Sequence, residues 1–147
     1  MKKLFILVGL PASGKSTYCS LLRSENLIIL SSDEIRLELF GDETCQANNK
    51  LVFDTLNKRV KDALKNNKDV VYDATSLTKV VRKNIITKFQ KDASEIICIF
   101  FNVSLDECIK RNSKRERTVP VDVLRKMANR LEVPDENEGF NRIIVQR

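Results

Sequence analysis

The chain has 147 residues, 42% hydrophobic and 31% charged, which is enough apolar material for one domain over 1–147 and too little bias for disorder. It contains no histidine, which excludes Ser-His-Asp hydrolysis and histidine-based metal sites. The net charge of +6 favours anionic partners, and no apolar run approaches the roughly 20 residues that span a bilayer, so we expect no membrane association.

The first predicted element is a strand over 4–8, a continuous apolar run of the kind that is buried on both faces of a sheet. It leads directly into Gly9-Leu10-Pro11-Ala12-Ser13-Gly14-Lys15-Ser16, a complete G-x-x-x-x-G-K-[ST] motif. Thr17 and a helical pattern that reaches Arg23 follow. A strand before this motif and a helix after it are the context that a phosphate-binding loop requires.

The residue types of the motif fit a bound triphosphate. The two glycines let the backbone turn so that successive N–H groups face one point. Lys15 can reach the β- and γ-phosphates, the Ser16 hydroxyl can coordinate Mg²⁺, and Thr17 can donate to an α-phosphate oxygen. We therefore expect nucleoside triphosphate binding by Gly9, Pro11, Ala12, Ser13, Gly14, Lys15, Ser16 and Thr17.

A second buried run, over 27–30, precedes a helix expected over 33–40, which opens on the capping-box sequence Ser31-Ser32-Asp33-Glu34. Asp33 lies at the carboxyl edge of the sheet, where ligands bind in open α/β folds, and Arg36 lies one helical turn later. The pair predicts a carboxylate that accepts a proton from an attacking hydroxyl, beside an arginine that holds a phosphate of the acceptor. The alternative is a helix-capping Asp33 with an exposed Arg36.

A helix with apolar residues at 56, 60, 63 and 64 leads to the third run, 70–72, which ends at Asp73. P-loop proteins carry at this place the acid that holds Mg²⁺ through water. The alternative is a turn and cap for the next helix, which begins after Thr78. Arg82, one turn into that helix, either supports a substrate phosphate or belongs to a solvated face.

The run 96–101 is the longest, and we expect it to be the central strand. A helix capped by Ser104 follows, then a basic segment, and Pro120 suits the first position of another helix. The segment from about 110 to 120 predicts a lid whose arginines close over transferring phosphate. The alternatives are a solvated charge run and a nucleic-acid patch. Its basic residues are Lys110, Arg111, Lys114, Arg115 and Arg117.

A last apolar run lies at 143–145. Buried strands that alternate with helices predict an α/β fold, a P-loop NTPase-like parallel sheet of about five strands sandwiched by helices. The four cysteines include no C-x-x-C pair, so we expect buried, reduced thiols and a cytoplasmic location. They are Cys19, Cys45, Cys98 and Cys108.

Together these residues resemble the 5′-kinase domain of polynucleotide kinases, within a P-loop kinase group that includes zeta-toxin-like and metabolite kinases. The resemblance runs from Lys3 to about Arg130, and its most specific part is Arg111-Asn-Ser-Lys-Arg115 with Val119-Pro-Val-Asp-Val-Leu-Arg125. It implies ATP and Mg²⁺ as ligands and Lys15, Asp33 and Arg115 as catalytic residues. The resemblance further implies that Arg111, Arg115 and Val119 bind the ATP. It implies that the acceptor is bound by Asp33, Arg36, Asp73, Thr75 and Arg82. The metal would be held by Ser16 and Asp73.

The chain also departs from that family. Ser32 stands where the family has an arginine, and the acid that ends the third strand is shifted by one place. The sequences Asp73-Ala-Thr-Ser and Pro134-Asp-Glu-Asn-Glu-Gly-Phe140 are more similar to kinase modules of bacterial RNA-repair enzymes. The resemblance implies transfer of the ATP γ-phosphate to the 5′-OH end of RNA or DNA. The alternatives are a kinase for a small-molecule hydroxyl and a non-catalytic ATP-binding module.

Overall fold

Strands and helices alternate along the chain in the computed structural model, which describes residues 2–22, 26–116 and 118–147. The strands are β1 (Lys3–Val8), β2 (Leu27–Ser31), β3 (Asp69–Asp73), β4 (Glu95–Phe101) and β5 (Arg142–Gln146). The α-helices are α1 (Lys15–Leu22), α2 (Ser32–Phe40), α3 (Asn49–Lys65), α4 (Lys79–Phe89), α5 (Leu105–Asn112) and α6 (Val121–Arg130). A short 3₁₀ helix, η1, spans Glu136–Glu138.

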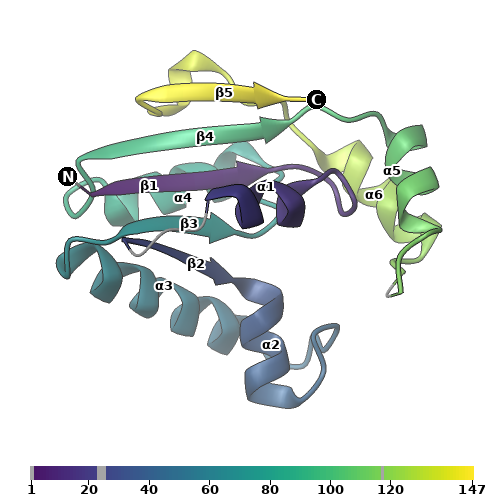
Figure 1. The fold of residues 1–147 in the computed structure, drawn as a ribbon, viewed down its shortest axis with the longest axis horizontal. Helices are drawn as coiled ribbons and strands as arrows, with labels where there is room; N and C mark the ends of the chain where they lie inside the picture. Colours follow the sequence, from purple (N-terminus) through teal and green to yellow (C-terminus); the bar gives the residue numbers. More distant parts are fainter. Residues whose placement is uncertain (1, 23–25, 117) are drawn as a thin grey trace.

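All five strands run parallel, in the order β2-β3-β1-β4-β5 (Figure 1). This confirms the predicted α/β fold with a five-stranded parallel sheet. Two details of the prediction are wrong. The central strand is β1, whereas the longer β4 lies beside it. The run Leu27–Leu30 is not buried on both faces, because it forms the edge strand β2 and its side chains are only half-buried.

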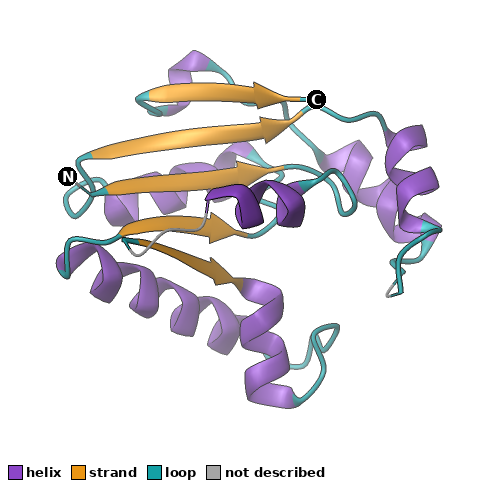
Figure 2. Cartoon of the chain, viewed as in Figure 1, coloured by secondary structure: helices purple, strands orange, loops and turns teal. Residues whose placement is uncertain are grey.

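Helices cover both faces of the sheet (Figure 2). Even-numbered strand residues such as Ile6, Tyr72 and Cys98 form the larger core with apolar residues of α3 and α4. Odd-numbered residues such as Leu7 and Ile99 pack with residues of α1. This alternation follows from the two-residue period of a strand. The carboxyl ends of the strands point toward α2, α5 and α6 (Figure 1).

Side-chain caps fix where the helices begin. The hydroxyls of Ser31, Thr78 and Ser104 each accept a hydrogen bond from the N–H three residues later, as the sequence predicts. Pro120 is the residue before the first turn of α6 and not its first helical position. Gly41 ends α2 in left-handed conformation, with φ of 72°.

Cys45, Cys98 and Cys108 are free thiols. Cys19, Cys98 and Cys108 are buried, whereas Cys45 is only partly so. Among the helices that the structure describes, none has both the length and the apolar character needed for a membrane span.

Candidate active site

The loop between β1 and α1 lies at the carboxyl end of the central strand. Ala12 and Gly14 adopt left-handed conformations, with φ of 65° and 102°. A Cβ atom on Gly9 would lie 2.7 Å from Ser13 Oγ and 3.0 Å from Phe101 Cβ, so a larger residue there would have to displace the Ser13 side chain. Turns of this kind direct consecutive N–H groups toward one point and create an anion site at the start of α1.

Lys15 lies inside this loop. Its Nζ donates to the carbonyl oxygen of Gly9 at 2.8 Å. Burial lowers the pKa of the Lys15 ammonium, while the charges of Asp73 and Asp33 oppose that shift. Both carboxylates therefore lie on the side of the loop where the ammonium is. Ser16 and Thr17 follow in the first turn of α1, and both are exposed.

The basic segment, which begins in the last turn of α5 with Lys110 and Arg111 and continues toward α6, borders the same loop. Arg111 Nη1 lies 3.8 Å from the position that a Cβ atom on Gly14 would take. Arg111 also pairs with Glu107 on the preceding turn, at 3.2 Å. Arg115 is close enough to Lys15 to lower the pKa of its ammonium. Two of the predicted lid arginines thus lie near the phosphate loop, whereas Arg117, like Arg23 after α1, lies outside the described residues.

A buried asparagine closes this segment. Asn112, only 3% exposed, donates to the carbonyl of Val119 at 2.7 Å and accepts from its N–H at 2.9 Å. The sequence analysis missed Asn112, because nothing in its neighbours shows that it faces Val119. Below it, Leu10, Leu77 and Cys108 form a small apolar cluster that joins the phosphate loop to α5 and to the segment after β3.

Asp33 and Arg36 lie together on the first turns of α2. Arg36 Nη1 donates to Asp33 Oδ1 at 2.9 Å, and Nη2 donates to Asn49 Oδ1 at 3.2 Å. The Arg36 guanidinium also lies 5.8 Å from the ring centroid of Phe53. The side chain of Arg36 is 10% exposed and that of Asp33 47%. The alternative of a capping aspartate with an exposed arginine is wrong, because Ser31 is the cap and Arg36 is buried.

Asp73 ends β3 and pairs with Ser31 of β2. Ser31 is two residues before Asp33 in the sequence, which brings the two aspartates to the same end of the sheet. Burial raises the pKa of the Asp73 carboxyl, Lys15 lowers it, and Asp33 and Glu34 raise it further. The two aspartates and Lys15 therefore share one edge of the sheet. Thr75 follows in the next loop, where its carbonyl accepts the N–H of Gly9 at 3.4 Å.

The donors at this edge fit a magnesium ion held together with phosphates. The side chains of Ser16 and Asp73 end in oxygen atoms, the ligand type that Mg²⁺ prefers, and Mg²⁺ commonly takes only one or two carboxylates beside the phosphates of a nucleotide. In the described part of the chain, no group of three or more Cys, Asp or Glu residues could hold a metal by itself. A metal here would thus depend on the nucleotide.

Arg82 differs from both sequence interpretations. It is fully buried, and all five of its N–H groups donate within the protein. Nε and Nη2 form a bidentate pair with Glu138 at 2.7 and 3.1 Å. Nη1 donates to the carbonyls of Ser76 and Leu77, and Nη2 also donates to that of Glu132. A solvated face is therefore wrong, and no donor of Arg82 is left for an acceptor phosphate.

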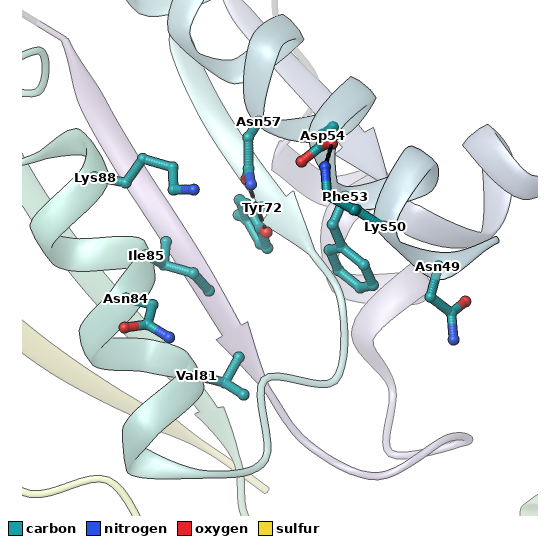
Figure 3. Close-up of a pocket in the computed structure, with 10 residues that line it drawn as sticks. All are labelled: Asn49, Lys50, Phe53, Asp54, Asn57, Tyr72, Val81, Asn84, Ile85 and Lys88. Carbon is teal, nitrogen blue, oxygen red and sulfur yellow. Dashed lines mark hydrogen bonds and ion pairs between the residues drawn. The ribbon is translucent and has the colours of Figure 1, made fainter.

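A groove of about 390 Å³ opens beside Arg36, between α3 and α4 (Figure 3). It continues into a smaller cavity of about 210 Å³ that Thr75 lines together with Met127 and Arg130 of α6. Phe53, Tyr72 and Val81 line both spaces. The sequence analysis did not find this groove, because its walls come from separate elements whose polar residues follow no motif.

Known proteins share this architecture. A family model described as an AAA domain matches residues 4–134. An L-seryl-tRNA(Sec) kinase of Methanococcus maripaludis is 28% identical over 137 residues, which cover 89% of this chain and 53% of that protein.

Two solved structures share the fold. One is described as the structure of the Pnkp1/Rnl/Hen1 RNA repair complex, in which a chain matches with a TM-score of 0.78 and 27% identity, over 88% of this chain and 44% of that one. The other is a gluconokinase of Sinorhizobium meliloti, with a TM-score of 0.59 and 15% identity over 97% of this chain and 81% of that one. The chain thus spans about half the length of the first two relatives.

Two of these relatives are named as kinases, and the matches specify no acceptor for this chain. The five-stranded sheet, the phosphate loop and the six helices together form a P-loop kinase fold. Since the family model covers most of the sequence, the chain belongs to the AAA domain family.

Proposed function

We propose that this chain is an ATP-dependent kinase that transfers the γ-phosphate to the 5′-hydroxyl end of RNA or DNA. The observation that carries the proposal is the Asp33–Arg36 pair, held at 2.9 Å on the same sheet edge as Lys15. A protein that only binds ATP needs the phosphate loop and has no use for a half-exposed carboxylate oriented by a buried arginine.

On this proposal the donor site is built from the phosphate loop and the basic segment. The loop N–H groups and Lys15 bind the β- and γ-phosphates. Arg111 and Arg115 stabilise the negative charge that develops as the bond from the γ-phosphorus to the ADP oxygen breaks. Val119 would lie near the adenine.

At the acceptor side, Asp33 accepts the proton of the 5′-hydroxyl. As the proton leaves, the hydroxyl oxygen bonds to the γ-phosphorus in line with the leaving ADP. Arg36 holds Asp33 in place and would bind the phosphate on the 3′ side of the first nucleotide. Asp73 and Thr75 would border the acceptor from the β3 side. Ser16 and Asp73 are the residues that would hold Mg²⁺, whose chemistry here is to neutralise phosphate charge.

A nucleic-acid acceptor is favoured by two relatives of different kinds. One is a kinase that acts on a seryl-tRNA, and the other belongs to an RNA repair complex. The net charge of +6 also suits an anionic acceptor.

The test is a transfer assay with labelled ATP, in which 5′-OH RNA and DNA oligonucleotides are compared with a panel of small hydroxyl metabolites. We expect label at the 5′ end of an oligonucleotide. Label on a metabolite alone would replace the proposal with a small-molecule kinase, and ATP binding without transfer to any acceptor would indicate a binding module.

Variants then test the roles. Lys15→Met should abolish turnover. Asp33→Asn should bind an ATP analogue normally, measured by calorimetry, and lose transfer by roughly a hundredfold or more, the usual range for a general base. Glu34→Gln is the matched control, since it removes the same charge from an exposed neighbour on the same turn. A near-normal rate for Asp33→Asn would exclude this carboxylate as the base.

A further inference from the structure

The groove between α3 and α4 has walls of unusual composition. The α3 wall carries Asn49, Lys50, Phe53, Asp54 and Asn57, and the α4 wall carries Val81, Asn84, Ile85 and Lys88. Figure 3 shows these side chains on either side of Tyr72, which comes from β3. The groove thus combines aromatic surface, apolar surface and three amide side chains.

This combination suits a nucleobase. Unstacked bases bind to aromatic rings and form hydrogen bonds through their edges, and amide side chains offer both a donor and an acceptor for such an edge. Tyr72 Oη donates to Asn57 Oδ1 at 3.1 Å, which fixes that amide. Among residues 2–22, 26–116 and 118–147, no acceptor is assigned to the Asn57 nitrogen, so it can donate to a ligand. A volume of about 390 Å³ lies within the range of ordinary small-ligand sites.

The groove also has one cation that is not neutralised by a neighbour. Lys50 pairs with Asp54 at 2.7 Å. Lys88, at the other wall, forms no ion pair among the residues that the structure describes. A phosphate that enters from solvent would therefore find its counter-charge at Lys88.

The groove is continuous with the proposed acceptor site. Asn49 lines it and accepts from Arg36 Nη2 at 3.2 Å. Phe53 lines it too, and its ring centroid lies 5.8 Å from the Arg36 guanidinium. A phosphate held by Arg36 is therefore followed directly by the aromatic ring and the amides.

We propose that this groove binds the second nucleotide of the acceptor strand. Its base lies against Phe53 with its edge at Asn57 and Asn84, and the next phosphate lies at Lys88. The inference rests on the proposed function, since it requires a nucleic-acid acceptor. It predicts that the enzyme distinguishes a strand from a mononucleotide.

The experiment compares phosphorylation of a nucleoside 3′-monophosphate with that of a 5′-OH dinucleotide 3′-phosphate. For the unmodified protein we expect KM to fall by roughly tenfold from the first to the second acceptor, the effect of one base stacked on an aromatic ring. In Lys88→Gln and Asn84→Ala, which leave the ring of Phe53 in place, this advantage should shrink in part, to about fivefold in each. Lys83→Gln is the matched control, because Lys83 is an exposed lysine of α4 that does not line the groove.

A second measurement does not depend on turnover. An oligonucleotide with 2-aminopurine at its second position should lose fluorescence when it binds, because the base stacks on Phe53. The loss should be much smaller with 2-aminopurine at the fourth position, and it should weaken in Phe53→Leu. The variants at the exposed positions 84 and 88 keep the test decisive if Phe53→Leu folds poorly.

The outcomes separate the two proposals. Equal KM values for the two acceptors, or equal effects of Lys83→Gln and Lys88→Gln, would overturn the second-nucleotide site and leave the kinase intact. If Lys88→Gln and Asn84→Ala change only the oligomeric state, a second copy of the chain covers the groove. That result would also overturn the second-nucleotide site. Failure to phosphorylate either acceptor, with transfer to a metabolite, would refute the proposed function, and the groove assignment would fall with it.

Discussion

Replacement of Arg82 is the sharpest test of how the fold supports its site. The side chain is fully buried, its partner Glu138 is 6% exposed, and the pair is bidentate at 2.7 and 3.1 Å. Removal of one partner from a buried ion pair typically costs about 3–5 kcal/mol, because it leaves the other charge buried and uncompensated. Arg82→Met should therefore lower the free energy of unfolding by about 4 kcal/mol, a large part of the usual 5–15 kcal/mol.

The assay is urea unfolding followed by circular dichroism. For a chain of this size we also expect Tm to fall by roughly 10 °C. Lys83→Met is the matched control, because Lys83 is the next residue of α4 and its side chain is exposed. This variant should change the free energy of unfolding by less than about 0.5 kcal/mol. Arg82→Lys should also destabilise, because an ammonium has three N–H groups and cannot replace five.

The double variant Arg82→Met with Glu138→Met adds a check on the cause. The double variant should lose less free energy of unfolding than the two single variants together, because removal of both Arg82 and Glu138 leaves no unpaired buried charge. A loss below about 1 kcal/mol for Arg82→Met would refute the reasoning, as would strict additivity in the double variant.

Three further predictions concern the phosphate loop, the β3 acid and alkaline pH. Gly9→Ala places a methyl group 2.7 Å from Ser13 Oγ, so the affinity for an ATP analogue should fall by about tenfold or more in calorimetry, and an unchanged affinity would contradict the tight fit. Asp73→Asn should raise Tm at pH 7 while it lowers turnover, because burial raises the pKa of this carboxyl and its charged form costs stability; a lower Tm would show that attraction to Lys15 outweighs burial. Burial raises the pKa of the Cys98 thiol from 9.0 to about 12. The thiol therefore ionises at lower pH in the unfolded chain, and stability should be lost as pH rises from 9 to 12. A Cys98→Ala variant whose urea midpoint falls equally steeply with pH would contradict this.

The sequence predicts the parts of the site whose chemistry is local. The residues of the phosphate loop are consecutive in the sequence, so the role of each can be predicted without knowledge of the tertiary structure. Asp33 and Arg36 are one helical turn apart, and that spacing alone brings them to one face. The parallel direction of the strands follows the usual rule for alternating strands and helices, whereas their order does not, since the sequence predicts the run 96–101 to be central and β1 is the central strand.

The parts that sequence reasoning missed depend on distant partners. Arg82 and Glu138 are 56 positions apart, and nothing near Arg82 distinguishes a buried arginine from a solvated one. The apolar run of β2 has the same composition as a buried strand, and its position at the edge of the sheet leaves it half-exposed. The groove likewise needs α3 and α4 to be placed side by side before Asn57 and Asn84 can be read together.

The two hydrogen bonds between Asn112 and Val119 have a consequence for how this protein could change over time. They tie Asn112, the last residue of α5, to Val119 just before α6, so the connection between the two helices has a fixed base. Substitutions or length changes within it are insulated from the packing of α5 on α6. The charge presented to a bound nucleotide could therefore be retuned without refitting the scaffold, provided that the asparagine at its base is kept.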